Sequence, residues 1–352
     1  MVELEVIDDA ARWHALLGDV GFSPWQQSRA YGAALAHAGR PVVRLRLHAA
    51  GETLGIVQVA GRLAAGGRFG AWHALGGPLW RAGMSDAAKT AALDALVRAF
   101  AGPLRPLILT PAAPPGRVRP ALEAAGLRRV MTGYTTAVLP VAASNERQAA
   151  RLHRSWRGAL AQSKKAPTTV ICREARGDLP ALDAALAAHE RERRRRGYAA
   201  ASPQLLAAAA RRGPALLATS SDPDGCHAFV LVFVHGATAT YQAGWTDVVG
   251  RAGRAHHRLL WEVLGALRAR GVRLLDLGGL NLPPGIVHFK LATGAVARTF
   301  AGIYVAGAGL RAPARCPSRE SRASSRGDSW VETPAPLSGA RRSSVCAAAR
   351  AG

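Results

Sequence analysis

Cysteine is scarce in this chain, and its few cysteines follow no pattern typical of a metal site or a disulfide framework. Cys172, Cys226, Cys316 and Cys346 form no CxxC pair and have no histidine-rich neighbourhood. This spacing favours free thiols in a reducing compartment and no metal. The sequence also lacks a run of 18 apolar residues, and it begins with the acidic stretch MVELEVIDD rather than with lysines and arginines. We therefore expect a cytoplasmic protein without a signal peptide or membrane span.

Acidic residues are also few, with 23 Asp and Glu against 46 Lys and Arg, which gives a formal net charge of +23. Residues 311–352 hold eight arginines and three acids, so most of the excess charge lies in residues 1–310. A basic body suits an anionic partner, such as nucleic acid, a phosphate-bearing substrate or an anionic membrane surface. A composition rich in alanine and arginine for reasons unrelated to function gives the same charge, and the sequence leaves both explanations open.

The pattern of apolar residues predicts an α+β protein, because alternating stretches and amphipathic stretches follow one another along the chain. One hairpin is clear, since two alternating stretches are joined by the turn residues AAGE. In the first half we expect strands at 2–6, 41–48, 54–62, 69–76, 104–110 and 127–139, and helices at 9–17, 23–38, 85–100 and 117–125. The expected N-caps of the first three helices are Asp8 or Asp9, Ser23 and Ser85. In the second half we expect helices at 147–163, 178–197, 203–211 and 254–270, and strands at 168–174, 214–219, 226–235, 238–245, 273–277 and 297–306.

The order of elements in the first half largely recurs in the second. We therefore predict two like domains, residues 1–140 and 147–306, each with a mostly antiparallel mixed sheet flanked by helices. Residues 311–352 differ in character, with eight serines, four prolines and few large apolar side chains. Such a segment cannot bury enough apolar surface to order itself, so we expect a disordered basic tail there.

One stretch near the end of the second half combines features typical of a ligand site. Leu274–Gly279 has the sequence LLDLGG, a buried strand closed by two glycines, and Phe289 and Lys290 follow after a short loop. Glycines allow the backbone to turn sharply or to approach a ligand closely. Only four of the 46 basic residues are lysines. Lys290 is either a surface lysine on a helix or a cation placed at a cleft to hold an anion or a developing negative charge.

The sequence resembles the Fem-type (FemAB) peptidyltransferase family over roughly residues 1–306. Members of that family have a tandem pair of GNAT-like acyltransferase folds, so the resemblance implies this fold here. Four stretches carry the resemblance: Trp25–Tyr31 (WQQSRAY), Arg154–Arg157 (RSWR) with Lys164-Lys165, Tyr241–Gly244 (YQAG) followed by Leu259–Glu262 (LLWE), and Asp276–Gly279 (DLGG) with Gly285 and Phe289-Lys290.

The resemblance implies an enzyme that transfers an aminoacyl or acyl group to a free amine, with a peptidoglycan precursor as the expected acceptor and a role in cell wall biogenesis. It implies no bound cofactor, and it makes the donor, aminoacyl-tRNA or acyl-CoA, a substrate. By the same resemblance Lys290 lies at the acyl-transfer site beside Phe289, and Arg194, Tyr198 and Tyr241 contact substrate. Arg194 and Tyr198 are four residues apart at the exit of a predicted helix, so we expect them on one helix face, lining a cleft with Lys290 and Tyr241. The lysine that family members often place near the first helices is absent here, where Arg29 and His37 stand instead.

Two alternative functions remain open at this stage. The first is acetyl-CoA-dependent N-acetylation, because Gly250, Gly253 and Ala255 partly match the loop with which simple GNAT enzymes hold the CoA pyrophosphate on backbone amides. The second is a non-catalytic Fem-like protein that binds tRNA or an envelope precursor. The arginines of residues 190–196 are either a solvated helix end or a phosphate contact. His256 and His257 have no other potential metal ligands near them in the sequence, so we expect them to be surface histidines.

Overall fold

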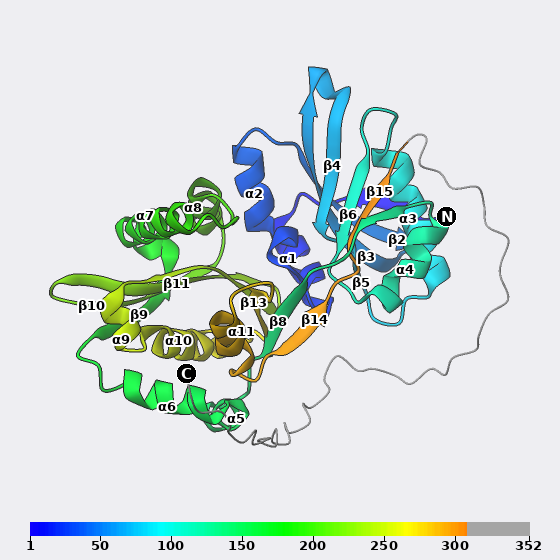
Figure 1. Ribbon diagram of the computed structural model, residues 1–352. Coiled ribbons are helices and arrows are strands. Elements are labelled where there is room, and N and C mark those ends of the chain that lie inside the picture. Colours follow the sequence, from blue (N-terminus) through cyan, green and yellow to red (C-terminus); the bar gives the residue numbers. More distant parts are fainter. Residues whose placement is uncertain (308–352) are drawn as a thin grey trace, which may run out of the picture. The chain divides into compact units, whose positions relative to one another are not determined.

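Two β-sheets organise residues 1–307, the part of the chain that the computed structural model describes (Figure 1). These residues lie within one compact unit. The predictions for residues 311–352, and those for Cys316 and Cys346, fall outside the described residues. The first sheet has the order β1-β2-β3-β4-β6-β15-β7, with β5 paired to β3, and the second has the order β14-β8-β13-β12-β11-β10-β9.

The bounds of the strands follow the expected stretches closely in most places. The first-sheet strands are β1 (Glu3–Val6), β2 (Val42–Ala49), β3 (Glu52–Ala64), β4 (Phe69–Gly76), β5 (Leu79–Trp80), β6 (Leu107–Pro111), β7 (Arg128–Met131) and β15 (Ile303–Ala306). The second-sheet strands are β8 (Thr135–Pro140), β9 (Thr169–Glu174), β10 (Ala215–Asp222), β11 (Gly225–His235), β12 (Thr238–Thr246), β13 (Leu274–Gly279) and β14 (Val296–Thr299).

Both sheets have the same sequence of pairings. From β1 to β4, and from β9 to β12, three antiparallel pairs follow one another. One parallel pair comes next in each sheet, β4 with β6 and β12 with β13. Two antiparallel pairs complete each sheet. The α+β class with two mixed sheets flanked by helices is therefore confirmed.

The two stretches predicted as single strands, 127–139 and 297–306, are each divided between the sheets. Residues 128–131 form β7 in the first sheet and residues 135–140 form β8 in the second, and β14 and β15 are divided in the same way. The two stretches run antiparallel as one ribbon, in which β7 pairs with β15 and β8 pairs with β14. A domain boundary drawn at residue 140 would therefore separate β8 from the strands on either side of it.

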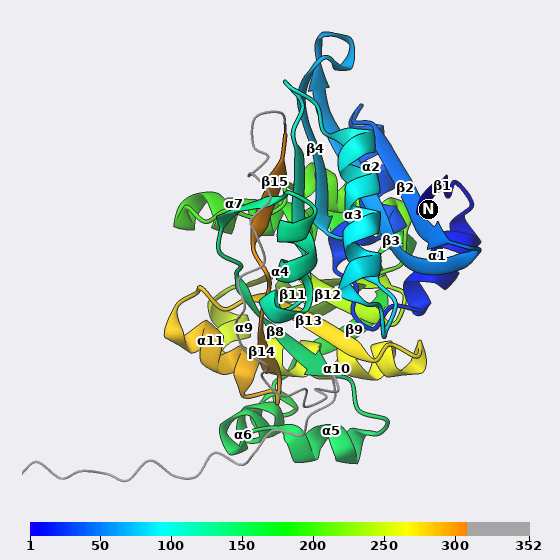
Figure 2. The same cartoon turned by 90° about the vertical axis from the view of Figure 1, so that its right-hand side faces the viewer.

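Helices cover both faces of the second sheet (Figures 1 and 2). A core cluster that includes Trp156, Leu259 and Leu264 fills the space between α6, α10 and the sheet. A second cluster joins α7 and α8 to the opposite face and includes Trp25 and Tyr31 of the first half. The α-helices are α1 (Ala10–Gly18), α2 (Arg29–His37), α3 (Asp86–Phe100), α4 (Pro115–Ala124), α5 (Asn145–Arg151), α6 (Arg154–Ser163), α7 (Leu179–Arg196), α8 (Pro203–Arg212), α9 (Val248–Ala252), α10 (Ala255–Ala269) and α11 (Pro284–Leu291).

Helix starts were predicted well where the cap is local and less well where a distant contact intervenes. Asp9 and Ser85 cap α1 and α3 as expected. The prediction that Ser23 caps a helix running from 23 to 38 is wrong, because Ser28 caps α2 by accepting from the amide of Tyr31. The Ser23 hydroxyl instead lies 3.2 Å from Nδ1 of His235, across the boundary between the two halves.

The helix expected over 147–163 is two helices. α5 ends at Arg151 and α6 begins at Arg154, with His153 as the N-cap. Nδ1 of His153 accepts the hydrogen bond from the Ser155 amide that would otherwise lack a partner. Within residues 1–307, no helix is both long enough and apolar enough to cross a membrane.

Candidate functional site

The parallel strands β12 and β13 separate part of the way along their length. They pair only from Thr238 to Thr240, opposite Leu274 to Asp276, although β12 continues to Thr246 and β13 to Gly279. A register shift in the β11–β12 pair at Tyr241–Ala243 bends β12 at this point. In the first sheet, β4 and β6 stay paired to Gly76 and Pro111, the last residues of the two strands. Only the second sheet therefore opens along its parallel pair.

Lys290 lies at the end of this opening. It is buried on α11, and its Nζ donates to the carbonyl oxygen of Gly279 at 2.8 Å. Asp276 is also buried, and one of its carboxylate oxygens accepts from the Thr136 hydroxyl at 2.5 Å and from the Gly278 amide at 2.8 Å. These bonds hold the turn that presents the Gly279 carbonyl, where Gly278 has a φ of 79° that favours glycine.

Burial governs the protonation of both groups. Desolvation lowers the pKa of Lys290 to about 8, and the negative charge of Asp276 opposes this shift. Desolvation also raises the pKa of Asp276, against the two hydrogen bonds that favour the carboxylate. Near neutral pH, Lys290 is still mostly an ammonium ion. It can therefore supply a positive charge in a site that is largely shielded from water.

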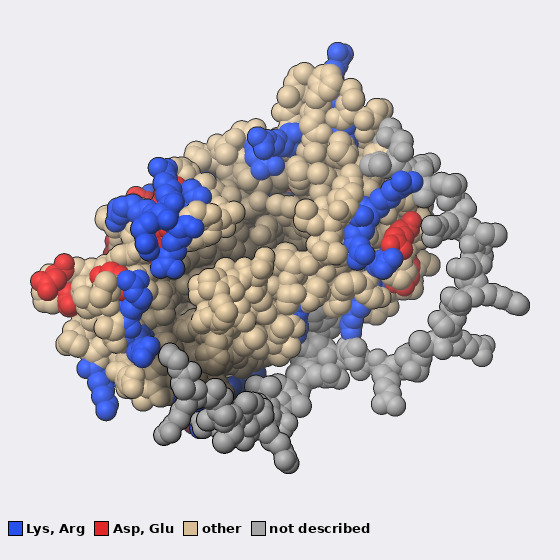
Figure 3. All heavy atoms as spheres, in the orientation of Figure 1, with Lys and Arg blue, Asp and Glu red and all other residues tan. Residues whose placement is uncertain are grey.

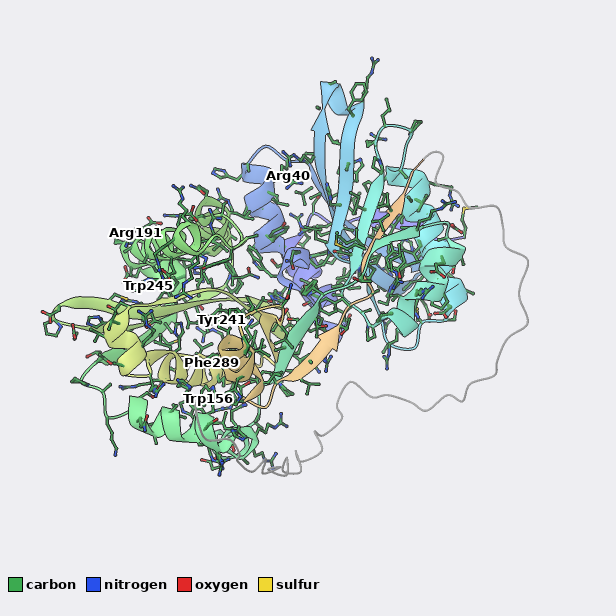
Figure 4. The ribbon with its side chains drawn as sticks, viewed as in Figure 1. Arg40, Trp156, Arg191, Tyr241, Trp245 and Phe289 are labelled. Carbon is green, nitrogen blue, oxygen red and sulfur yellow. The ribbon has the colours of Figure 1, made fainter. Side chains whose placement is uncertain are left out.

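A cavity of about 530 Å³ lies between α6, the start of α10 and α11. This volume is in the range of small-molecule sites. Its walls combine aromatic rings with polar groups, and they include Trp156, Gln162, Arg254, His257, His288 and Phe289. Phe289, the neighbour of Lys290, contacts the His257 ring at a centroid distance of 5.0 Å. Figure 4 shows Tyr241, Phe289 and Trp156 following one another from β12 through α11 to α6.

Of the three predicted substrate contacts, Tyr198 influences Tyr241 electrostatically, whereas Arg194 is paired elsewhere. Tyr241 packs against the same core cluster as Phe289, and the nearby Tyr198 hydroxyl adds to the burial that raises the pKa of Tyr241. The Arg194 side chain is 77% exposed and pairs with Glu190 at 2.7 Å. The argument that Arg194 and Tyr198 share a helix face is wrong, because α7 ends at Arg196 and Gly197 reverses the chain in a left-handed conformation.

The end of α7 is the most strongly basic feature of the face shown in Figure 3, at the edge of a hollow in the surface. Its last turn holds Arg193, Arg194, Arg195 and Arg196. Glu190 pairs with the first two of these arginines and Glu192 with the last two. The cluster is therefore partly neutralised from within the same helix.

The loop expected to hold a CoA pyrophosphate uses most of its amides internally. The Gly250 amide donates to the Asp247 carboxylate and the Gly253 amide to the Val249 carbonyl, because residues 248–252 form the short helix α9. A Cβ at Gly250 would lie 2.5 Å from the His227 carbonyl oxygen, so this glycine serves packing. Ala255 begins α10, whose N-terminus, with Arg254, borders the cavity. An open row of amides from Gly250 onward is thus missing.

His256 is the residue that sequence reasoning missed. The expectation of a surface histidine is wrong for this position, since Nε2 of His256 is closed off from solvent and has no hydrogen-bond partner. The burial of this nitrogen depends on the packing of α10 against the sheet, for which the sequence gives no signal. Among residues 1–307, no group of three or more His, Cys, Asp or Glu side chains is arranged to hold a metal ion.

The second half matches a protein-family model. Residues 145–290 match the model described as Acetyltransferase (GNAT) domain. This range contains α6, the opening between β12 and β13, and Lys290. The second half of the chain is therefore similar to a GNAT domain. No match was found among curated proteins.

Solved structures extend the likeness to the whole described chain. FemX superposes with a TM-score of 0.70 at 15% identity, covering 86% of this chain and 96% of that chain. A conserved protein of unknown function from Bacteroides thetaiotaomicron gives 0.58 at 12% identity, covering 87% and 99%. The C-terminal domain of a putative lysylphosphatidylglycerol synthetase from Agrobacterium fabrum gives 0.53 at 13%, covering 84% and 90%. The chain thus has a Fem-like GNAT fold, and at the level of the fold the resemblance drawn from the sequence is confirmed.

Proposed function

We propose that the protein is an N-acyltransferase that transfers an aminoacyl group from aminoacyl-tRNA to the free amine of a cell-wall precursor. The observation that carries the proposal is the opening between β12 and β13 with the Lys290 ammonium at its end. The GNAT-type domain spans this opening. The likeness to FemX, and to a domain of a protein named for an aminoacyl lipid product, favours an aminoacyl donor.

In this reaction the protein has to position the two substrates and to stabilise a developing negative charge. The acceptor amine attacks the carbonyl carbon of the donor ester, and the carbonyl oxygen takes on negative charge in the tetrahedral intermediate. The ester C–O bond then breaks, the donor oxygen leaves as an alkoxide, and the amine proton passes to solvent or to that oxygen, which becomes a hydroxyl. Lys290 stabilises the oxyanion, and the buried site strengthens this interaction because little water competes for the charge.

Acetyl-CoA-dependent N-acetylation is the second candidate. It is favoured by the cavity at the N-terminus of α10, where Arg254 and the helix dipole suit an anionic group, and by the description of the matching family model. The backbone amides of Gly250 and Gly253 argue against acetyl-CoA as the donor, because they already form hydrogen bonds within and around α9 and are not free to bind a pyrophosphate.

Mass spectrometry distinguishes these functions. The full-length protein is incubated with a precursor pool and either a charged tRNA mixture or acetyl-CoA, and the mass added to the precursors is measured. We expect an aminoacyl mass with charged tRNA. Lys290→Ala should slow product formation by about 10²–10³-fold. The exposed Lys165 provides a matched control, because Lys165→Ala should form product at the wild-type rate. An acetyl mass supports the second candidate. Binding of tRNA or precursor without any product, unchanged in Lys290→Ala, would support the non-catalytic alternative.

A further inference from the structure

The helices α6 and α11 lie side by side at the surface of the second half (Figures 1 and 2). The amide of His153, the N-cap of α6, donates to the carbonyl oxygen of Ala292, the C-cap of α11, at 2.9 Å. Residues 147–163 and 280–291, the segments that contain these helices, have no Asp or Glu. We call the surface formed by these two segments the α6–α11 surface. It is therefore a part of the molecule without acidic side chains of its own.

The cations of the α6–α11 surface keep their full charge, unlike those of α7. Its exposed arginines are Arg147, Arg151, Arg154 and Arg157. None of these four side chains forms an ion pair with a residue in the described range 1–307. At the end of α7, by contrast, Glu190 and Glu192 pair with all four arginines of the last turn. The α6–α11 surface is thus the one of the two that attracts an anionic partner without competition from nearby carboxylates.

Exposed apolar side chains adjoin these cations. On α11 and the loop before it, Leu282, Ile286 and Leu291 are 42%, 40% and 38% exposed. Unpaired cations beside exposed aliphatic side chains match an anionic lipid bilayer, because the headgroups attract the cations and the acyl boundary receives the apolar groups. RNA would also attract arginines, but its bases stack on aromatic rings and gain little from aliphatic side chains. The combination therefore favours lipid over RNA.

We propose that the α6–α11 surface docks the protein on a membrane that contains anionic phospholipid. Charge complementarity selects this partner. A second copy of the chain on the same surface would place arginines opposite arginines, and residues 311–352 are themselves basic, with eight arginines against three acids. The surface adjoins the cavity that Ser155 and His288 line, and α11 also carries Lys290. Docking therefore holds the candidate site close to the lipid headgroups.

Vesicle sedimentation of the full-length protein tests the proposal. We expect binding to phosphatidylcholine vesicles with about 30% phosphatidylglycerol, and at least roughly tenfold weaker binding to pure phosphatidylcholine. Arg151→Gln combined with Arg154→Gln should weaken binding to the anionic vesicles about 20-fold, since each cation near such a surface contributes about fivefold. Leu282→Ser combined with Ile286→Ser should weaken it about tenfold, because less apolar surface leaves water. Equal melting temperatures verify that the variants are folded.

The end of α7 provides a matched control. Arg195→Gln combined with Arg196→Gln removes the same charge, but from arginines that Glu192 already pairs. This variant should bind the anionic vesicles as tightly as the wild type. Equal losses in the two arginine variants would overturn the proposal, as would equal binding to neutral and anionic vesicles. A loss of affinity for uncharged tRNA in the variant of Arg151 and Arg154, with unchanged vesicle binding, would overturn it in favour of an RNA surface.

Hydrogen exchange of the wild-type protein locates the surface without any substitution. With anionic vesicles present, backbone amides of residues 147–163 and 280–291 should exchange more slowly, whereas those of residues 190–196 should exchange as in the free protein. Protection of residues 190–196 instead, or of neither segment of the α6–α11 surface, would refute the inference. Neither assay contains an acyl donor. A failure here therefore leaves the proposed N-acyltransferase function standing, and an absence of acyl transfer leaves the docking surface standing.

Discussion

At the residue scale, the buried ammonium of Lys290 makes the expected reaction pH-dependent. Its pKa of about 8 lies well below the ordinary value because burial disfavours the charged form. The positive charge is present below pH 8 and is lost as the pH rises through that value. We expect kcat to fall on the alkaline side with an apparent pKa near 8, and Lys290→Ala to lower kcat by about 10²–10³-fold at pH 7.

An arginine at the same position provides the control. Lys290→Arg keeps its charge throughout this range, so any activity that it retains should lack the alkaline decline. The measurement is the pH profile of kcat for both proteins with one donor. An identical alkaline decline in the arginine variant would show that another group titrates.

His227 is a second residue whose charge matters, in this case for stability. Its imidazole lies 2.8 Å from Asp247 and 2.8 Å from Asp222, and these carboxylates raise its pKa. A raised pKa in the folded state means that the pairing contributes fully below the unfolded value of about 6.5 and is lost as the pH rises through the folded value. We expect the difference in unfolding free energy between wild type and His227→Gln to shrink from pH 6 to pH 9. Denaturant titrations at several pH values measure it, and a constant difference would exclude the imidazolium.

At the element scale, the ribbon that joins the sheets depends on two glycines at which its two antiparallel strands come close together. A Cβ at Gly133 would lie 1.8 Å from the Phe300 carbonyl oxygen, and one at Gly302, where φ is 115°, would lie 2.3 Å from that of Met131. The two backbones can approach this closely only without side chains. We expect Gly133→Ala and Gly302→Ala each to lower the unfolding free energy by about 3 kcal/mol, measured by urea titration.

Gly265 offers a matched control within α10. Nothing lies within 4 Å of a Cβ built there, and the helix interior favours alanine. Gly265→Ala should therefore raise the unfolding free energy by about 0.5–1 kcal/mol. If alanine at 133 or 302 were as well tolerated as at 265, the close approach of the two strands would not exist in solution.

At the scale of residues 1–307, the two sheets depend on each other because each holds a strand from the other half. A fragment 147–306 lacks β8, which separates β13 from β14, and a fragment 1–140 lacks β15, which separates β6 from β7. We expect neither fragment to unfold cooperatively alone, whereas co-expression should restore a cooperative transition. Circular dichroism melting of the fragments, alone and together, measures this. A sharp transition in either fragment alone would show that the exchanged strand is dispensable.

The candidate site illustrates what could and could not be foreseen. Lys290 and Phe289 were singled out because a rare lysine follows a strand that ends in glycines, a local pattern. Their roles stay predictions. The grouping of Arg194 with Tyr198 failed because residue spacing assumed a helix that Gly197 ends. The burial of the His256 Nε2 atom could not be foreseen, because it depends on how α10 packs in the tertiary structure.

The sequence by itself determined the α+β class, most element bounds and the caps of α1 and α3, since these depend on side-chain periodicity and on contacts within one turn. Only the tertiary structure decided which sheet each part of residues 127–139 and 297–306 joins. The side chains of a strand alternate with period two whichever neighbour the strand pairs with, so this pattern does not specify the neighbouring strand or the sheet. The choice of neighbour comes from close packing between distant segments, here from two backbones that approach each other at Gly133 and Gly302. The same kind of long-range packing opens β12 from β13 and brings Lys290 to the gap.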